Sequence, residues 1–202
     1  MAEIARKIRS RIGGRLRGVA AGRRSGLLDL LPKSSVGCEI GVWKGDFSVQ
    51  ILETVEPREL HLVDPWWFAD EAGYVQAWYG GALARTQDDM DQIYEGVKRR
   101  LRVPIDQGIV VIHRSESATV AITFADDYFD WVYIDGNHVY EYVMADLVGF
   151  TPKVKHGGLV TGDDYANRGW WEDGVRRAVD QFVASGAVEA VSRSDQFILK
   201  RR

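Results

Sequence analysis

A chain of 202 residues is long enough for one α/β domain with a complete sheet and leaves little room for a second domain. Hydrophobic residues make up 46% and charged residues 27%, the balance of a globular protein, and no uncharged apolar run approaches the length of a membrane span. Cys38 is the single cysteine, which excludes an internal disulfide and any multi-cysteine zinc or iron–sulfur site. The start of the chain lacks the compact apolar stretch of a secretory signal, so we expect a cytoplasmic protein.

Basic side chains are concentrated at the start of the chain. Residues 1–24 carry eight of them against one glutamate, about +7, although the formal charge of the whole chain is −3. Apolar residues recur among the arginines at helical spacing: Ile4, Ile8, Ile12, Leu16 and Val19. Residues 1–30 are therefore predicted to hold a basic amphipathic helix, followed by a single domain over 31–202. Such a helix docks its apolar stripe on the domain or on a second subunit, as in a homo-oligomer, or else binds an anionic lipid or polymer.

The rest of the chain alternates short apolar runs with helical patterns, which indicates βαβ units and a parallel sheet. Strands are predicted at residues 36–40, 60–63, 109–113, 131–134 and 159–161. Helices are predicted at residues 47–54, 117–124, 140–150 and 171–185. Two further strands, 188–192 and 197–200, are joined by a short polar turn and should form an antiparallel hairpin at the sheet edge. The predicted fold class is α/β, Rossmann-like, with a seven-stranded, mostly parallel sheet and helices on both faces.

One connection is unusually long. Residues 65–108 separate the second and third predicted strands, too far for a plain crossover, so we expect a partly helical, lid-like insertion. Aromatic residues gather in this insertion and after the fifth strand: Trp66, Trp67, Tyr74, Trp78, Tyr79, Tyr165, Trp170 and Trp171. Such rings either stack on a ligand or pack the lid onto the core, and we expect about half to do only the latter, because tryptophan is usually largely buried.

Polar groups directly after the apolar runs are the place to look for chemistry, because ligands of open α/β sheets bind beyond the carboxyl ends of the strands. Gly41 and Gly45 flank a turn after the first strand, where the missing Cβ lets a ligand approach the backbone. Their spacing is not the G-x-G-x-x-G of a dinucleotide loop, which argues against NAD. Asp64 ends the second strand, where a carboxylate can accept hydrogen bonds from ribose hydroxyls, although such an aspartate is also a common helix cap.

Three carboxylates follow strands that should be neighbours. Asp135, Asp163 and Asp164 would repel one another unless a cation joins them or some become protonated, although any one alone could equally cap a helix. Oxygen ligands select a hard ion, so Mg²⁺ is the expected metal, with Mn²⁺ or Ca²⁺ as substitutes. His138 lies three residues after Asp135, and a neutral imidazole can accept a proton near physiological pH.

The stretch IDGNHVYEYVMADL, followed by GGLVTGDDY, resembles the small metal-dependent O-methyltransferases of class I, which use S-adenosylmethionine. The likeness is strongest to the macrolide-sugar type (methyltransferase 24) and covers roughly residues 34–185. It implies that Asp135, Asp163 and Asp164 hold Mg²⁺ and that His138 is the general base, with Asp135 beside it in catalysis. Catechol-type relatives have asparagine in place of Asp164.

The order of a glutamate, a glycine turn and a later aspartate also resembles the donor site of this class. The residues assigned to S-adenosylmethionine are Glu39, Gly41, Gly45, Asp64, Ser115 and Asp135. The predicted function is therefore a Mg²⁺-dependent O-methyltransferase. Its acceptor would be a small molecule or oligosaccharide with a sugar hydroxyl, because aromatic rings beside carboxylates suit a pyranose better than a catechol.

The alternatives are a hydroxylase or a small-phenol methyltransferase on the same sheet, and a nucleotide- or glycan-binding module without turnover. A methyl-transfer assay with labelled donor separates the enzymes, because a hydroxylase needs oxygen and a reductant. Nucleic acid is not expected as a partner.

Overall fold

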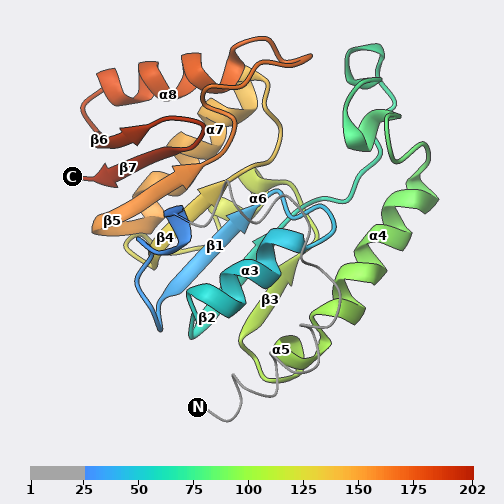
Figure 1. Cartoon of the computed structure of the whole chain (residues 1–202), viewed down its shortest axis with the longest axis horizontal. Coiled ribbons are helices and arrows are strands. Elements are labelled where there is room, and N and C mark those ends of the chain that lie inside the picture. Colours follow the sequence, from blue (N-terminus) through green and yellow to red (C-terminus); the bar gives the residue numbers. More distant parts are fainter. Residues whose placement is uncertain (1–25) are drawn as a thin grey trace.

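The structure is a computed structural model that describes residues 26–202. Most of the basic amphipathic helix predicted over residues 1–30, namely residues 1–25, lies outside the described residues. Figure 1 shows the arrangement of a central sheet with helices on both faces. None of the helices in the described part of the chain has the length and apolar character needed to cross a membrane.

Within residues 26–202, seven strands form one sheet in the order β3-β2-β1-β4-β5-β7-β6. The strands are β1 (Val36–Ile40), β2 (Glu59–Val63), β3 (Val110–His113), β4 (Phe129–Ile134), β5 (Val154–Gly162), β6 (Val188–Arg193) and β7 (Phe197–Arg201). The pairs among β1 to β5 are parallel, and β7 is antiparallel to both β5 and β6. The predicted α/β fold with an antiparallel C-terminal hairpin is confirmed.

Two apolar layers enclose the sheet, and successive residues of β4 alternate between them. Trp131 and Tyr133 pack in the layer under α3 (Asp46–Thr54), α4 (Gln87–Arg100) and α5 (Arg102–Asp106). Val132 and Ile134 pack in the opposite layer, under α6 (Ser117–Ala121), α7 (Tyr140–Phe150) and α8 (Gly174–Ala184). All five residues of β1 are buried, as expected for a central strand covered on both faces.

The long connection after β2 has two parts. Its second part is helical, because α4 and α5 form the crossover to β3, and α4 begins with a capping box between Thr86 and Asp89. Its first part, residues 64–86, contains the short 3₁₀ helices η1 (Ala72–Tyr74) and η2 (Trp78–Gly80) and extends past α4 at the upper right of Figure 1. We call residues 64–86 the insertion.

Two elements start three or more residues away from their predicted positions. Strand β5 begins at Val154 rather than at residue 159, and its polar start is held by the ion pair of Lys155 with Asp130. Helix α8 begins at Gly174 rather than at residue 171, because a turn closed by the carbonyl of Gly169 and the amide of Glu172 precedes it. One further 3₁₀ helix, η3 (Thr151–Lys153), leads into β5.

Candidate active site

The turn after β1 is fixed by glycine. Gly41 has a φ of 87°, and a Cβ there would lie 2.1 Å from the backbone oxygen of Asp135, so a side chain cannot be accommodated. The amide of Gly41 donates to the carbonyl of Val63 at the end of β2. Gly45, also at positive φ, caps the start of α3. The ends of β1, β2 and β4 are thereby held together beside this turn.

Asp64 organises the same turn from the end of β2. Its Oδ2 accepts hydrogen bonds from the backbone amides of Val42 and Trp43, both at 2.9 Å, and its Oδ1 accepts one from the amide of Trp66 at 2.7 Å. Burial raises the pKa of Asp64, although these three hydrogen bonds and the charge of Arg114 act in the opposite direction. The carboxylate therefore holds the glycine turn in place and keeps little spare acceptor capacity.

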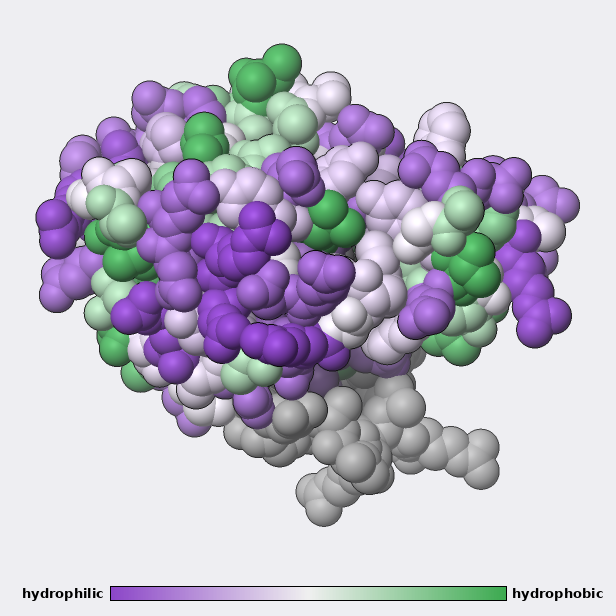
Figure 2. All heavy atoms as spheres, turned by 90° about the horizontal axis from the view of Figure 1, so that it is seen from above, coloured by the Kyte–Doolittle hydropathy of each residue, from purple (hydrophilic) through white to green (hydrophobic). Residues whose placement is uncertain are grey.

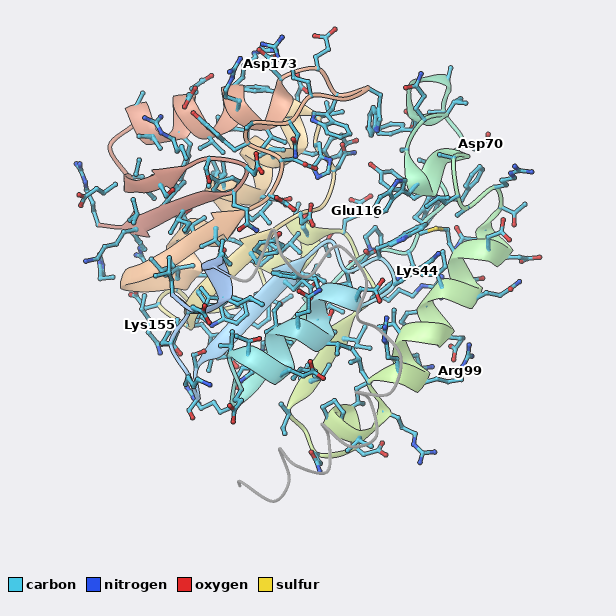
Figure 3. The ribbon with its side chains drawn as sticks, viewed as in Figure 1. Lys44, Asp70, Arg99, Glu116, Lys155 and Asp173 are labelled. Carbon is cyan, nitrogen blue, oxygen red and sulfur yellow. The ribbon has the colours of Figure 1, made fainter. Side chains whose placement is uncertain are left out.

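Glu39 and Ser115, the other residues assigned to the donor, lie at the ends of β1 and of β3. Glu39 is buried and accepts a hydrogen bond from the hydroxyl of Ser48 on α3, so it links strand to helix. Ser115 is in the turn between β3 and α6. Figure 3 labels Lys44 and Glu116, which lie in the turns after β1 and β3, and shows both turns at the same end of the sheet.

A carboxylate and imidazole group lies beyond β4 and β5. Nε2 of His138 is 3.2 Å from Oδ1 of Asp135 and 3.5 Å from Oδ2 of Asp164. One ligand atom from each of these residues falls within 4.8 Å of the others. The three side chains are only 15–21% exposed, so electrostatic interactions among them are weakly screened.

Asp163 stands beside this group without belonging to it. Its amide donates to the carbonyl of Ile134, which continues the pairing of β4 with β5, and its charge acts on His138. Asp164 has a φ of 60°, a left-handed conformation that aspartate tolerates better than most residues, and it accepts a hydrogen bond from Nδ2 of Asn167 at 2.6 Å. With this backbone conformation, the side chain of Asp164 contacts the imidazole of His138, whereas Asp163 lies outside the three-residue group.

The carboxylates also set the protonation of His138. Burial lowers its pKa, but the hydrogen bond that the imidazole donates to Asp135 and the charges of Asp135, Asp164 and Asp163 outweigh burial, so that the pKa is raised overall. The imidazole is therefore an effective proton acceptor.

Aromatic side chains from two separate segments meet over this group. Tyr74 of the insertion accepts a hydrogen bond from Nδ2 of Asn137 at 3.1 Å, and its ring contacts Trp170 edge to face at 5.1 Å. The ring of Trp171 lies 4.6 Å from that of His138. Two buried polar atoms here have no hydrogen-bond partner among the described residues, namely the hydroxyl of Tyr79 and Nε1 of Trp171.

Some of the remaining aromatic residues are buried and others are exposed to solvent. Trp66 is fully buried and donates its indole N–H to the carbonyl of Trp43, so it anchors the insertion. Trp67 and Trp78 are 71% and 57% exposed. Figure 2 shows the face that carries α8 and the insertion as largely hydrophilic with scattered hydrophobic residues.

Two residues of this region were not among the site residues predicted from the sequence. Asn137, between Asp135 and His138, links the loop after β4 to the insertion. Asp146 is 4% exposed on α7 and accepts a hydrogen bond from the hydroxyl of Ser117. Burial raises the pKa of Asp146 to about 6, although this hydrogen bond opposes the effect. A signal existed for Asp146, because Val143, Leu147 and Phe150 mark the buried face of α7 on which it lies.

The sequence model of one protein family, described as a methyltransferase domain, matches residues 38–165. The match extends from β1 through the glycine turn and both acidic strand ends. The chain therefore belongs to this methyltransferase family and is an S-adenosylmethionine-dependent enzyme of class I. No curated protein matches it in sequence.

Solved structures share the fold at low sequence identity. The O-methyltransferase TomG from Streptomyces achromogenes, in complex with S-adenosylmethionine, is 19% identical with a TM-score of 0.60, covering 98% of this chain and 87% of that one. Rv0187 from MTB, with bound cofactor, is 15% identical with a TM-score of 0.63 over 99% and 88%. SMU.1697c from Streptococcus mutans, in complex with S-adenosylhomocysteine, is 10% identical with a TM-score of 0.59 over 93% and 100%.

Proposed function

We propose that this enzyme is a Mg²⁺-dependent O-methyltransferase that transfers the methyl group of S-adenosylmethionine to a hydroxyl of a sugar, an oligosaccharide or a sugar-bearing natural product. The observation that carries the proposal is the contact of His138 with Asp135 and Asp164 beyond the carboxyl ends of β4 and β5. A base beside a group of carboxylates is the arrangement needed to activate an alcohol. The comparison with TomG, an O-methyltransferase of the same fold, supports oxygen as the acceptor atom.

The donor is assigned to the turn after β1 and the ends of β2 and β3. Gly41 and Gly45 give this turn its left-handed backbone, although the space left by the missing Cβ of Gly41 is filled by the backbone of Asp135 and not by a ligand. Asp64 is the proposed strand-end carboxylate for the ribose. Glu39, Ser115 and Asp135 complete the proposed set. This is the position at which open α/β sheets bind nucleotides.

The residues present fit a hard cation. Asp135 and Asp164 bring carboxylate oxygens within 4.8 Å of each other and would hold Mg²⁺. Asp163 lies outside this group but close enough for its charge to act on His138, and it is proposed as the third carboxylate of the metal site. His138 falls within the same distance, but magnesium prefers oxygen, which leaves the imidazole nitrogen for proton transfer. Bound Mg²⁺ would supply electrostatic stabilisation that lowers the pKa of an acceptor hydroxyl.

His138 is proposed to take the proton of the acceptor hydroxyl at Nε2. Asp135 orients the imidazole through the 3.2 Å hydrogen bond and stabilises the imidazolium that forms. The acceptor oxygen then attacks the methyl carbon, the bond from carbon to sulfur breaks, and S-adenosylhomocysteine leaves with the electron pair on sulfur. The rings of Trp171, beside His138, and of Tyr74, which is bonded to Asn137, offer a sugar both an apolar face and a hydrogen-bonding group.

The proposal is tested by incubating the enzyme with S-adenosylmethionine, Mg²⁺ and either methyl glycosides and oligosaccharides or catechols, and by measuring S-adenosylhomocysteine. We expect turnover with a glycoside and much less with catechols. Turnover with catechols alone would show that the acceptor is a small phenol and not a sugar. Donor binding without turnover on any acceptor or metal would support a binding module.

A further inference from the structure

The hydroxyl of Tyr79 is an unpaired polar group inside the molecule. It is buried and has no hydrogen-bond partner among residues 26–202. A buried hydroxyl without a partner is unfavourable for the folded protein, because it has lost its hydrogen bonds to water. Such a group needs an explanation, and a ligand that supplies the missing partner is one.

The backbone holds Tyr79 firmly in this position. Its carbonyl accepts a hydrogen bond from the amide of Ala69 at 3.0 Å. The next residue, Gly80, is packed so closely that a Cβ would lie 2.0 Å from the carbonyl oxygen of Tyr74. Tyr79 is therefore fixed beside Tyr74, and the two rings are 6.0 Å apart.

The surroundings of the hydroxyl connect it to the donor half of the site. Burial raises the pKa of Tyr79, and the neighbouring groups Tyr74, Asp64 and Tyr142 raise it further. The preceding residue, Trp78, places this part of the insertion beside Asp64, the carboxylate assigned to the ribose, because its ring lies 5.7 Å from that of Trp43, whose backbone amide donates to Asp64. Tyr74 has other partners, because it bonds to Asn137 and forms a side-chain hydrogen bond with Tyr142. Among these tyrosines, Tyr79 is the one whose hydroxyl is buried and unpaired.

Asp64 cannot bind both hydroxyls of a ribose by itself. A carboxylate has about four acceptor positions, and the backbone amides of Val42, Trp43 and Trp66 occupy three of them. One position remains for a vicinal diol that brings two hydroxyl groups. A second partner must lie close to Asp64.

We infer that the Tyr79 hydroxyl is this second partner, so that the insertion contributes directly to donor binding through the ribose. The inference rests on the proposed assignment of Asp64 to the donor. The insertion residue and the strand-end carboxylate would then each bind one hydroxyl of the diol. Tyr79 would be a donor-binding residue and would not contact the acceptor.

This role gives Tyr79→Phe a distinctive combination of effects. Removal of an unpaired buried hydroxyl should raise the melting temperature of the ligand-free protein, while loss of its hydrogen bond should weaken binding of S-adenosylhomocysteine roughly 2- to 10-fold. Tyr128→Phe is the matched control, because the Tyr128 hydroxyl donates to Glu59 at 2.9 Å. That variant should lose stability and leave binding unchanged.

The experiment is calorimetric titration of the full chain with S-adenosylhomocysteine and its 2′-deoxy and 3′-deoxy analogues. The Tyr79→Phe effect should disappear with one deoxy analogue and persist with the other. Unchanged affinity for S-adenosylhomocysteine, or an equal loss with both analogues, would overturn the inference. Asp64→Asn separates the two failures: if it weakens binding while Tyr79→Phe does not, only Tyr79 is misassigned, and if neither variant weakens binding, the donor site itself is misplaced.

Discussion

His138 and Asp135 are joined by a hydrogen bond of 3.2 Å between Nε2 and Oδ1, across one turn of the chain at the end of β4. The contact orients the imidazole and couples its protonation to the carboxylates around it. The same contact also allows a second role, in which His138 only supports a metal ligand. The two roles predict different kinetics.

His138→Ala should lower kcat by about 10²–10⁴ while the affinities for donor and Mg²⁺ stay nearly unchanged. The base must be neutral to act, so the wild-type rate should fall as pH drops through the pKa of His138, and this acid limb should be absent in the variant. Kinetics across pH, with metal and donor titrations, provide the measurement. Weaker metal binding together with rescue by excess Mg²⁺ would show that His138 only supports a metal ligand and is not the base.

Chelation should abolish activity, and Mg²⁺ should restore it, because the carboxylates beyond β4 and β5 otherwise repel and the acceptor oxygen has no electrostatic partner. Asp135→Asn and Asp163→Asn should mimic chelation. Asp164→Asn should cost less, since an amide oxygen can still accept and the resemblance includes relatives with asparagine there. Full activity after exhaustive chelation, with no metal in elemental analysis, would exclude the metal.

Asp64→Ala should weaken S-adenosylmethionine binding by about 1–3 kcal/mol through the loss of charge-assisted hydrogen bonds. The structure adds a second effect, because Asp64 also accepts from the amides of Val42, Trp43 and Trp66. Thermal unfolding should therefore show lower stability in the ligand-free variant as well. Calorimetry that finds an unchanged dissociation constant would remove Asp64 from the donor site.

Asp146→Asn should stabilise the protein at neutral pH. Burial raises the folded-state pKa of Asp146 from 3.8 to about 6, so the unfolded chain ionises first as pH rises. The wild-type protein should lose stability between about pH 4 and pH 6, by up to ~3 kcal/mol, and the loss should persist above that window. Urea unfolding at pH 4, 5 and 7 measures the effect, which the variant should lack.

Ser117→Ala serves as the control for this prediction. Removal of the hydroxyl that donates to Asp146 should raise the pKa of the carboxyl further, so that the loss of stability with rising pH becomes larger and extends to higher pH. An equal pH dependence in the wild type and in Asp146→Asn would show that Asp146 is not the group responsible.

Apolar runs and their spacing were sufficient to predict the sheet, because the strands β1, β2 and β4 are largely buried on both faces and stand out in the sequence. The start of β5 could not be predicted, since Lys155 and His156 interrupt the apolar pattern and the strand begins with an ion pair to Asp130. The hairpin and its place at the sheet edge could be predicted, but the pairing of β7 with β5 joins distant segments and could not be read from spacing.

For the site, the sequence predicted which strand ends carry chemistry but not how their side chains are oriented. The left-handed φ of Asp164, which brings it to His138 and sets Asp163 apart from the group, depends on local backbone that no spacing reveals. The three hydrogen bonds that Asp64 accepts from backbone amides could likewise not be predicted from the sequence. The contacts of Tyr74 with Asn137 and Trp170 join segments far apart in the chain, and periodicity carries no information about them.

The most direct test of the proposed function follows a deuterated methyl group from S-adenosylmethionine into the product by mass spectrometry, with a glycoside acceptor and Mg²⁺. The account predicts one labelled methyl group on a sugar oxygen, one equivalent of S-adenosylhomocysteine, and loss of both with His138→Ala. A product that gains an oxygen atom while the donor is not consumed would contradict it and identify a hydroxylase on the same fold.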